Sequence, residues 1–485
     1  MLDLEQLRIV HPGYDEYVYR WDYYARSYMG AEEYRDGAFL RKYIGEDDAP
    51  GHQYAQRLMD TPYQNHCKTT VDTYRSFLFR NPPTRSLGNL VDNDFARSFI
   101  MDADLNGTSM DGFMRKVSDS ISIYGSAWIC VDRPAYMAAS AAEEIELDIR
   151  SYVSLYNPVS VMDWEYRKQV NGRKELVYIK VVEEQTDDWD IIKVWDKETV
   201  GVYKLAKDSV KRVTNSLSMG NRNYQKDAMV AEYSEILEYE EYVNPIGRVP
   251  FICAVDDNSF WDGIGVSDIG DVADLSRSIY NKLSELYANI RISSHPSIVA
   301  EPSTQLNGGV GAVITVDENT NIQPYLLQPT GASIQGIIDA INLDIDAINE
   351  ITHLKAVKAR NGQPMSGVAL ATERQNLNNK LGDRASALER TENLIWNLWF
   401  LWQGIDIIDD EFDIYYEKSF DMRDKHSDLE LYRKAIETVP HDAFVHSIHN
   451  EVARMLIEDE SELQEVIDKI AQDHARGNMG MPNAE

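Results

Sequence analysis

Residues Ile264–Pro296, "IGVSDIGDVADLSRSIYNKLSELYANIRISSHP", contain the clearest periodic pattern of the chain. The apolar residues recur at spacings of three and four, which is the period of a helix with one buried face. They are Ile269, Val272, Leu275, Ile279, Leu283, Leu286 and Ile290. The spacing predicts one amphipathic helix over Ser267–Ser293, roughly 40 Å long at 1.5 Å per residue. Pro296 ends it, because proline cannot continue a helix.

Two more long helices are predicted downstream, with a β-rich segment before the first of them. Residues 297–329 contain short β-runs separated by Asn-Gly-Gly and by Asn and Asp turns, which predicts a small hairpin unit. Ala332–Ile351 repeats isoleucine at helical spacing, and its polar face holds Asp339, Asp344, Asp346 and Glu350. Val368–Gln403 carries a stripe of leucines and predicts the longest helix of the chain.

An acid-free island separates these two helices. The stretch His353–Thr372, "HLKAVKARNGQPMSGVALAT", contains Lys355, Lys358 and Arg360 and no acidic residue. The chain as a whole has 80 Asp plus Glu against 48 Lys plus Arg, a net charge of -32. A basic segment that also contains Gly and Pro is unusual in so acidic a chain.

The remaining segments predict an α+β fold. Residues 1–85 read as helices with two proline breaks, and residues 92–124 add two more helices before a buried strand at Ala127–Val131. From Tyr152 to Val255 the apolar period changes to two, which is typical of a sheet, with a hairpin turn at Asn171–Gly172. A short β-like run, "EFDIYYEKSF", precedes a charged helical end, Ser427–His474.

Composition excludes several classes of protein. A protein that wraps DNA needs a basic face, and a chain at -32 repels nucleic acid in bulk, although the acidity also simply favours solubility. Charged residues occur throughout the first thirty positions, which argues against a signal peptide. No apolar run reaches the length of a membrane-spanning helix, roughly 18 to 20 residues. The densest run, Leu394–Ile405, is predicted to be a buried helix end. Three scattered cysteines, Cys67, Cys130 and Cys253, favour a reduced, intracellular origin.

The motifs of common enzymes and metal sites are missing from the sequence. There is no phosphate-binding G-x-x-x-x-G-K-[ST], no H-E-x-x-H and no G-x-S-x-G, and Gly308–Gly311 reads as a hairpin turn. His441, His446 and His449 lie close together, but a solvated helix face explains them better than a metal site does, because nothing else in the sequence supplies convergent ligands. Residues 256–268 resemble a calcium loop only loosely, because Phe260 stands where Asp or Asn is required. We therefore expect no catalytic residues, no cofactor and no metal.

The order of these elements resembles the portal proteins of tailed bacteriophages over nearly the whole chain. The resemblance is carried by five stretches: "YAQRLMDTPYQNHCKTTVDTYRSFLFRNPP", "DGFMRKVSDSISIYGSAWICVD", "YVSLYNPVSVMDWEY", "IGVSDIGDVADLSRSIYNKLSELYANIRISSHPSIVAEP" and "ATERQNLNNKLGDRASALERTENLIWNLW". Each is a weak pattern, and their joint order is the specific signal. The C-terminal 60 residues, approximately, depart from the family pattern, which leaves the helical crown the least supported part.

The resemblance implies a portal fold with these parts. Residues 1–264 correspond to the wing, 265–293 to the first stem helix, 294–330 to the clip, 331–352 to the second stem helix, 353–367 to the tunnel loop, 368–421 to the long wing helix with a return strand, and 422–485 to the crown and tail. Turns in the clip fall at Asn307, Gly308, Gly309, Asn319 and Asn321, and Gly362, Pro364 and Gly367 shape the tunnel loop.

The resemblance also implies a function without enzymatic activity. Portal proteins form rings, usually dodecamers, at one capsid vertex of the virion, and double-stranded DNA enters and leaves through the central channel. The expected partners are the terminase large subunit, the head–tail adaptor, and the major capsid and scaffold proteins, with assembly in the host bacterial cytoplasm and no membrane. The acidic residues of the second stem helix would line the channel, and Lys355, Lys358 and Arg360 would either touch DNA in passing or pair with acids of a neighbouring subunit.

Two rival interpretations remain open from the sequence. One is a carboxylate-based, virion-associated hydrolase, which needs a convergent polar pocket in a compact domain. The other is a different ring-forming head–tail protein, such as an adaptor, although adaptors are usually much shorter chains.

Overall fold

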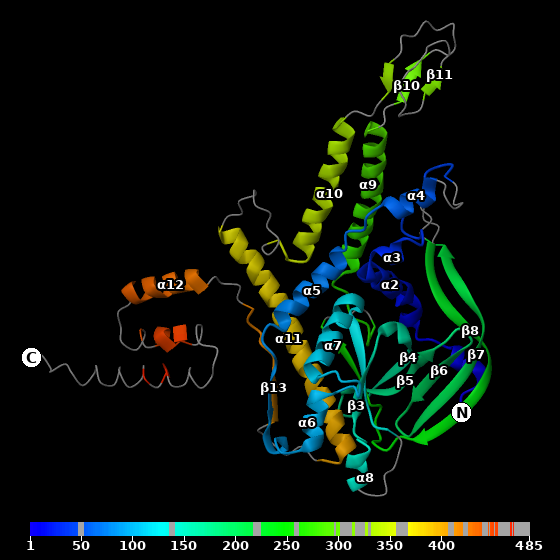
Figure 1. Ribbon diagram of the computed structural model, residues 1–485. Helices are drawn as coiled ribbons and strands as arrows, with labels where there is room; N and C mark the ends of the chain where they lie inside the picture. The colour runs from blue at the N-terminus through cyan, green and yellow to red at the C-terminus, as the bar shows by residue number, and fades with distance from the viewer. Residues whose placement is uncertain are drawn as a thin grey trace, which may run out of the picture. The chain divides into compact units, whose positions relative to one another are not determined.

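The computed structural model describes residues 1–46, 53–134, 141–216, 225–256, 261–294, 297–300, 313–315, 325–327, 331–355, 367–405, 412–420 and 425–438, with a few more between 445 and 469. The chain divides into two units, Met1–Phe420 and Asp421–Glu485, and α12 (Lys425–Thr438) belongs to the second. Helices and sheets are mixed, which confirms the α+β class (Figure 1). Among the described helices, none combines the length and the apolar character needed to cross a membrane.

The N-terminal part is helical, as predicted, and its helix ends carry ordinary capping residues. The helices are α1 (Leu4–Arg8), α2 (Pro12–Met29), α3 (Ala31–Tyr34), α4 (Gln53–Asp60) and α5 (His66–Leu78). Asp3 and Gln6 cap α1 reciprocally, and Asn65 accepts from the backbone of α5. The two helices predicted next are α6 (Asp94–Met101) and α7 (Met110–Tyr124), after η1 (Gly88–Leu90).

Two antiparallel sheets follow where the apolar period changes to two. A three-stranded sheet has the order β3-β2-β9, from β2 (Ser126–Asp132), β3 (Tyr152–Tyr156) and β9 (Phe251–Val255). A five-stranded meander has the order β4-β5-β6-β7-β8, from β4 (Val161–Lys168), β5 (Lys174–Gln185), β6 (Trp189–Trp195), β7 (Thr199–Ser216) and β8 (Gln225–Val243). Short helices α8 (Ala141–Glu146) and η2 (Pro158–Ser160) flank β3. The turn between β4 and β5 holds Gly172 at φ 85°, as the Asn-Gly signal predicts.

An aromatic core joins the first helices to these sheets. Trp21 of α2 is almost fully buried against Trp128 of β2, Trp164 of β4 and Trp195 of β6 in one cluster. Burial of large aromatic side chains contributes most of the apolar area of such a core. The N-terminal helices are therefore an integral part of the first unit.

The long helices lie close to their predicted boundaries. They are α9 (Gly270–Ser294), α10 (Gly331–Ile351) and α11 (Gly367–Gln403). The first begins three residues later than predicted, because Ser267 turns its hydroxyl to the carbonyls of α7 and caps the backbone N–H of Ile269 instead of entering the helix. Trp396 and Trp399 are fully buried, as predicted for the end of α11, but Leu394 and Leu401 are 48% and 42% exposed, so this helix end is buried on one face only.

The small sheet between α9 and α10 differs from the predicted hairpin unit. Its strands are β10 (Ser297–Ala300), β11 (Val313–Thr315) and β12 (Tyr325–Leu327), in the order β11-β10-β12. The first two pair in parallel, so no hairpin joins them, and the prediction was wrong here. The twelve residues between them are long enough for a crossover. The turn residues Asn307, Gly308, Gly309, Asn319 and Asn321 lie outside the described residues.

Two short strands that are far apart in the sequence pair with each other. The β-like run predicted near residue 412 is β13 (Phe412–Tyr415), which pairs antiparallel with β1 (Thr84–Leu87). Arg85 of β1 donates to the fully buried Glu392 of α11, which also accepts from the Tyr416 hydroxyl at 2.5 Å. This buried ion pair attaches the two-stranded ribbon to α11.

Candidate functional site

The helices α9 and α10 run side by side as a helical hairpin (Figure 1). Their contact is built from the apolar stripes that the sequence predicts, including Ile279 and Leu283 on α9 and Ile341 and Ile348 on α10. Lys282 of α9 crosses this contact and places its Nζ 2.6 Å from the Asp344 carboxylate of α10. One of the four predicted channel acids is thus bound within the hairpin.

The other three predicted channel acids share one exposed stripe of α10. Asp339, Asp346 and Glu350 are exposed, and Leu343 stands between them with 70% of its surface exposed. The spacing of four, three and four residues keeps all four positions on one helix face. Asp339 accepts from Gln335 at 2.8 Å, and within the described residues no ion pair reaches these three carboxylates. The stripe is therefore a negatively charged surface in the single chain.

The predicted basic island follows this stripe directly. Lys355 is half-buried and is the last residue described before the gap. Lys358, Arg360, Gly362 and Pro364 lie outside the described residues, and Gly367 is the first residue of α11. The structure thus leaves the role of these residues as a prediction, while it fixes the two helix ends that carry the island.

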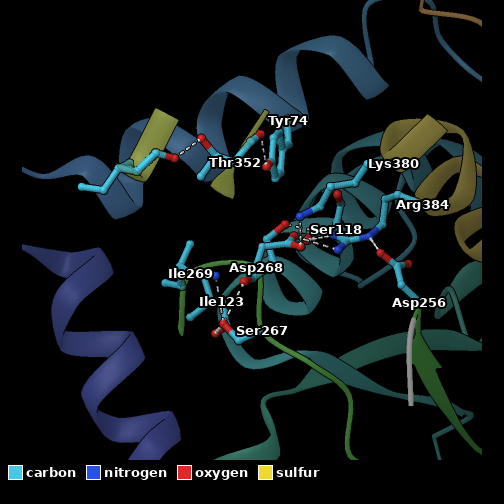
Figure 2. Close-up of polar contacts among 12 residues, drawn as sticks. Tyr74, Ser118, Ile123, Asp256, Ser267, Asp268, Ile269, Thr352, Lys380 and Arg384 are labelled. Carbon is cyan, nitrogen blue, oxygen red and sulfur yellow. Dashed lines mark hydrogen bonds and ion pairs between the residues drawn. The ribbon is translucent and has the colours of Figure 1, made fainter. Parts of the chain in front are cut away.

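A buried charged cluster lies at the base of the hairpin (Figure 2). We call Asp256, Asp268, Lys380 and Arg384 the base cluster. Arg384 donates to both carboxylates, at 2.9 Å to Asp268, and its Nη1 also reaches the Ser122 hydroxyl at 2.9 Å. Lys380, one turn earlier on α11, lies 3.0 Å from Asp268. Two cations and two anions therefore balance in a site where the Arg384 and Asp268 side chains are only 5% and 8% exposed.

The pKa values of the base cluster follow from the competition between burial and charge. Burial opposes ionisation of Asp268, but Arg384 and Lys380 outweigh it and hold the pKa below its ordinary value. For Asp256, burial outweighs the attraction of Arg384, and the pKa is raised. Burial also opposes the charge of Arg384, but the two carboxylates raise its pKa. Asp268 is thus the firmly ionised partner of α11.

Two further contacts tie both ends of the hairpin to the same body. Before α9, the Ser267 hydroxyl lies 2.7 Å from the Ile123 carbonyl of α7. After α10, the Tyr74 hydroxyl of α5 donates to the Thr352 carbonyl at 2.7 Å, and the Lys380 ammonium lies 5.1 Å from the Tyr74 ring (Figure 2). The basic island therefore follows a helix end, that of α10, which a buried hydrogen bond fixes.

Sequence reasoning missed the base cluster, although one signal for it was present. Lys380 and Arg384 sit on the same α11 stripe as Leu377, Leu381 and Leu388, at spacings of three and four. A cation on a buried stripe requires a buried anion, because an unpaired buried charge is costly. The sequence does not name that anion, since Asp256 and Asp268 are more than a hundred residues away.

A profile of the family described as "Phage portal protein, SPP1 Gp6-like" matches residues 39–393. The match covers more than half of the chain, and it includes the hairpin, the basic island and the whole base cluster. The chain belongs to this family. A search of curated proteins found no match.

Family membership identifies the general role of this phage portal protein. The family is one of structural, ring-forming proteins of the virion that work in packaging, with partners in the phage head and tail. Residues 1–38 lie outside the matched range, yet Trp21 and Leu7 within them are buried in the first unit. These residues are thus built into the same fold.

The histidines singled out in the sequence give no evidence for a metal centre. His441 and His446 lie outside the described residues, and His449 is described without them. In the part of the chain that the structure describes, no group of three or more His, Cys, Asp or Glu side chains is arranged to hold a metal ion.

Proposed function

We propose that the chain forms a ring at one capsid vertex and that its centre is the channel for double-stranded DNA, inward during packaging and outward during ejection. One observation carries the proposal beyond the family assignment. The exposed stripe of Asp339, Asp346 and Glu350 on α10 leads directly into the acid-free segment that contains Lys355, Lys358 and Arg360. In a ring, the acidic stripe would repel the phosphates of double-stranded DNA, and the adjacent cations would contact them only briefly. Such an arrangement suits DNA that has to move through the channel without binding tightly.

The physical argument is one of weak and screened contacts. Phosphate contacts position nucleic acid without reading its sequence, so a channel that uses only them accepts any DNA. The Debye length is about 8 Å at physiological salt, so the acidic stripe acts only on DNA that approaches closely. Copies around a ring multiply weak contacts. Alternatively, the three cations pair with acids of a neighbouring subunit and act as assembly contacts. Replacing all three by Ala distinguishes the two roles, because only the second predicts a loss of rings.

The remaining parts are proposed from the family pattern. Residues 1–264 form the wing, 265–293 and 331–352 the stem, 353–367 the tunnel loop, 368–421 the long wing helix with its return strand, and 422–485 the crown. Residues 294–330 form the clip, which docks the terminase large subunit and later the head–tail adaptor. A three-stranded sheet with strands of three or four residues supports this, because so small a sheet needs neighbouring copies or partners for stability. Capsid and scaffold proteins are the expected partners of the assembled ring in the host cytoplasm.

No specific observation favours the hydrolase. The buried carboxylates Asp256 and Asp268 share one guanidinium, so they serve as ion-pair partners rather than as an acid–base couple. We therefore propose an ATP-independent channel without enzymatic activity.

Electron microscopy of the purified chain tests the proposal. We expect rings with a central hole, and DNA packaging that depends on a separate motor. Compact monomers at all concentrations, or ATP hydrolysis by the chain alone that a single carboxylate change abolishes, would contradict it.

A further inference from the structure

An open groove lies between α11 and the first residues of β5 and β9. It has a volume of about 550 Å³, and Phe251 and Val249 form its apolar wall opposite α11. The α11 wall is a leucine stripe, by which we mean Leu394, Leu398 and Leu401. The spacings of four and three residues place all three on one face of the helix. Leu394 and Leu401 are 48% and 42% exposed, and large apolar side chains exposed around a hollow mark an interaction surface.

The opposite face of α11 is covered within the chain. Trp396 and Trp399 are fully buried, and their ring centroids lie 5.2 and 5.9 Å from that of Phe99 on α6. The leucine stripe is only partly covered by the described residues. It extends over about two turns, roughly 10 Å, which suits a second helix laid along α11, because rows of side chains at these spacings interdigitate when helices pack.

The rim of the groove is basic, although the chain carries a net charge of -32. Arg173, Lys174 and Arg248 line it, and the last two have exposed side chains, at 58% and 56%. Lys174 contacts the Asp262 carboxylate and Arg248 contacts that of Glu175, whereas Arg173 forms no ion pair within the described residues. Three cations against two acids leave the rim positively charged.

We propose that this groove docks an acidic amphipathic helix of a different protein. Docking of an amphipathic helix in an apolar groove is a common mode of peptide recognition. Apolar side chains of the partner, spaced three and four residues apart, cover the leucine stripe, and Asp or Glu side chains beside them face Arg173 and Arg248. The inference goes beyond the proposed function, because docking on this surface requires neither a ring nor DNA.

Charge selects this partner and its place on the chain. A net charge of -32 repels acidic partners over most of the surface, so a basic rim beside an apolar floor directs them to the groove. Double-stranded DNA is also attracted to a basic rim, but it has no apolar side chains to cover the leucine stripe. The stripe and the rim together therefore favour an acidic helix over DNA. A second copy of this chain is acidic as well, and the state of assembly separates it from a foreign helix.

A designed peptide tests the docking. The probe is a fluorescein-labelled helical peptide of about 15 residues, with leucine on one helical stripe and glutamate on both flanks. Fluorescence anisotropy measures its binding to the full chain, and we expect saturable binding. We expect the dissociation constant to be about tenfold larger or more for a peptide in which lysine replaces every glutamate, and for one with the same residues in scrambled order.

Variants of the chain locate the binding. The stripe variant carries Leu394→Asp and Leu401→Asp, and the rim variant carries Arg173→Glu and Arg248→Glu. We expect each to weaken binding of the acidic peptide by about tenfold or more. We also expect the rim variant to bind the lysine peptide more tightly than the wild-type chain does, because its rim is then acidic. Only chains with the wild-type thermal midpoint are compared.

Two controls separate a specific contact from net charge and from loss of exposed apolar surface. Arg97→Glu with Lys116→Glu makes the same charge change on α6 and α7. Met29→Asp with Met59→Asp adds two acids at positions of α2 and α4 that are 70% and 67% exposed. We expect both control variants to bind the acidic peptide as the wild-type chain does.

Four results would overturn the proposal. They are absence of binding by the acidic peptide, equal binding of the acidic, lysine and scrambled peptides, binding that the stripe and rim variants retain, and binding that the control variants lose. A peptide that binds single chains but is excluded from rings would assign the groove to a second copy instead. A short DNA duplex that displaces the peptide from the wild-type chain and binds the stripe variant equally well would assign the rim to DNA. Because the assay needs no channel, failure of the proposed function leaves its outcome unchanged.

Discussion

Arg384 of α11 donates to the carboxylate of Asp268 at 2.9 Å, across 116 positions of the sequence. Asp268 lies just before α9, and Arg384 lies on the helix that follows the basic island. The contact therefore closes a loop of chain that holds the hairpin, the small sheet and the island. Any change in the position of α11 relative to the base of the hairpin has to break or bend this contact.

Replacing Arg384 by Met should destabilise the first unit by about 3–5 kcal/mol, because it leaves two buried carboxylates with only Lys380 as counter-charge. The matched control in the same unit is Arg97→Met on α6, whose side chain is 52% exposed and pairs with the exposed Asp92, and an exposed ion pair of this kind contributes about 1 kcal/mol or less. Urea denaturation followed by tryptophan fluorescence measures both. Equal midpoints for the two variants would refute the structural role of the base cluster.

Tyr74→Phe should loosen the end of α10 without unfolding the unit. It removes one buried hydrogen bond, to the Thr352 carbonyl, at a cost of about 1 kcal/mol. Hydrogen exchange should become faster at residues 348–354 and stay unchanged in the β-sheets. Tyr287→Phe, on a side chain 48% exposed, serves as the control and should change neither. Unchanged exchange at residues 348–354 in the Tyr74 variant would show that this contact does not hold the helix end.

Gly125→Ala should be far more damaging than Gly247→Ala, although both glycines have positive φ, at 90° and 63°. At Gly125 an added Cβ would lie 2.4 Å from the backbone carbonyl of Gly265, so the segment before α9 would have to shift. At Gly247 nothing lies within 4 Å, so only the left-handed backbone penalty of about 1–2 kcal/mol applies. Thermal midpoints give the comparison, and a Gly247 variant that is as unstable as the Gly125 variant would contradict the steric argument.

The burial of Lys180 predicts that the free energy of unfolding rises with pH. Its fully buried ammonium donates to the Leu7 carbonyl at 3.0 Å and to that of Ile9, at the end of α1, and burial lowers its pKa to about 8. Between pH 8 and the ordinary pKa of 10.5 the unfolded chain binds more protons than the folded one, so the folded state gains stability as pH rises. Below pH 8 both states are protonated and this pH dependence vanishes.

The Lys180→Met variant isolates this contribution. The unfolding free energy of the wild-type chain, minus that of the variant, should rise by up to about 3 kcal/mol between pH 8 and 10.5. A difference that stays flat over this range, or that falls, would show that Lys180 is not held with a lowered pKa.

Changing Lys355, Lys358 and Arg360 together to Ala should leave ring assembly nearly unchanged and alter packaging or retention of DNA. Transient contacts between cations and DNA phosphates are weak and screened, and ring assembly does not use them if the three residues meet only DNA. The triple change to Glu should be worse, since every copy would then repel the DNA. Loss of rings in the Ala variant, with normal packaging wherever rings are recovered, would assign the three residues to subunit contacts.

The type and extent of most elements could be predicted from local sequence patterns. The isoleucine and leucine stripes predicted α9, α10 and α11 to within about three residues, because a helical period is a local property of the side chains. The change to a period of two marked the sheets for the same reason. The family resemblance rested on the order of these elements, and it was confirmed over residues 39–393.

Tertiary structure alone decided which distant segments meet. The pairing of β1 with β13, the parallel pairing of β10 with β11 and the choice of Asp256 and Asp268 as partners of Arg384 depend on packing of the whole unit. A buried cation predicts only that some anion lies beside it. The sequence does not show which of the chain's 80 Asp and Glu side chains is that anion. The choice is set by the path of the backbone, because a charge pair is strong only where the surrounding core excludes water and holds both groups within hydrogen-bond distance.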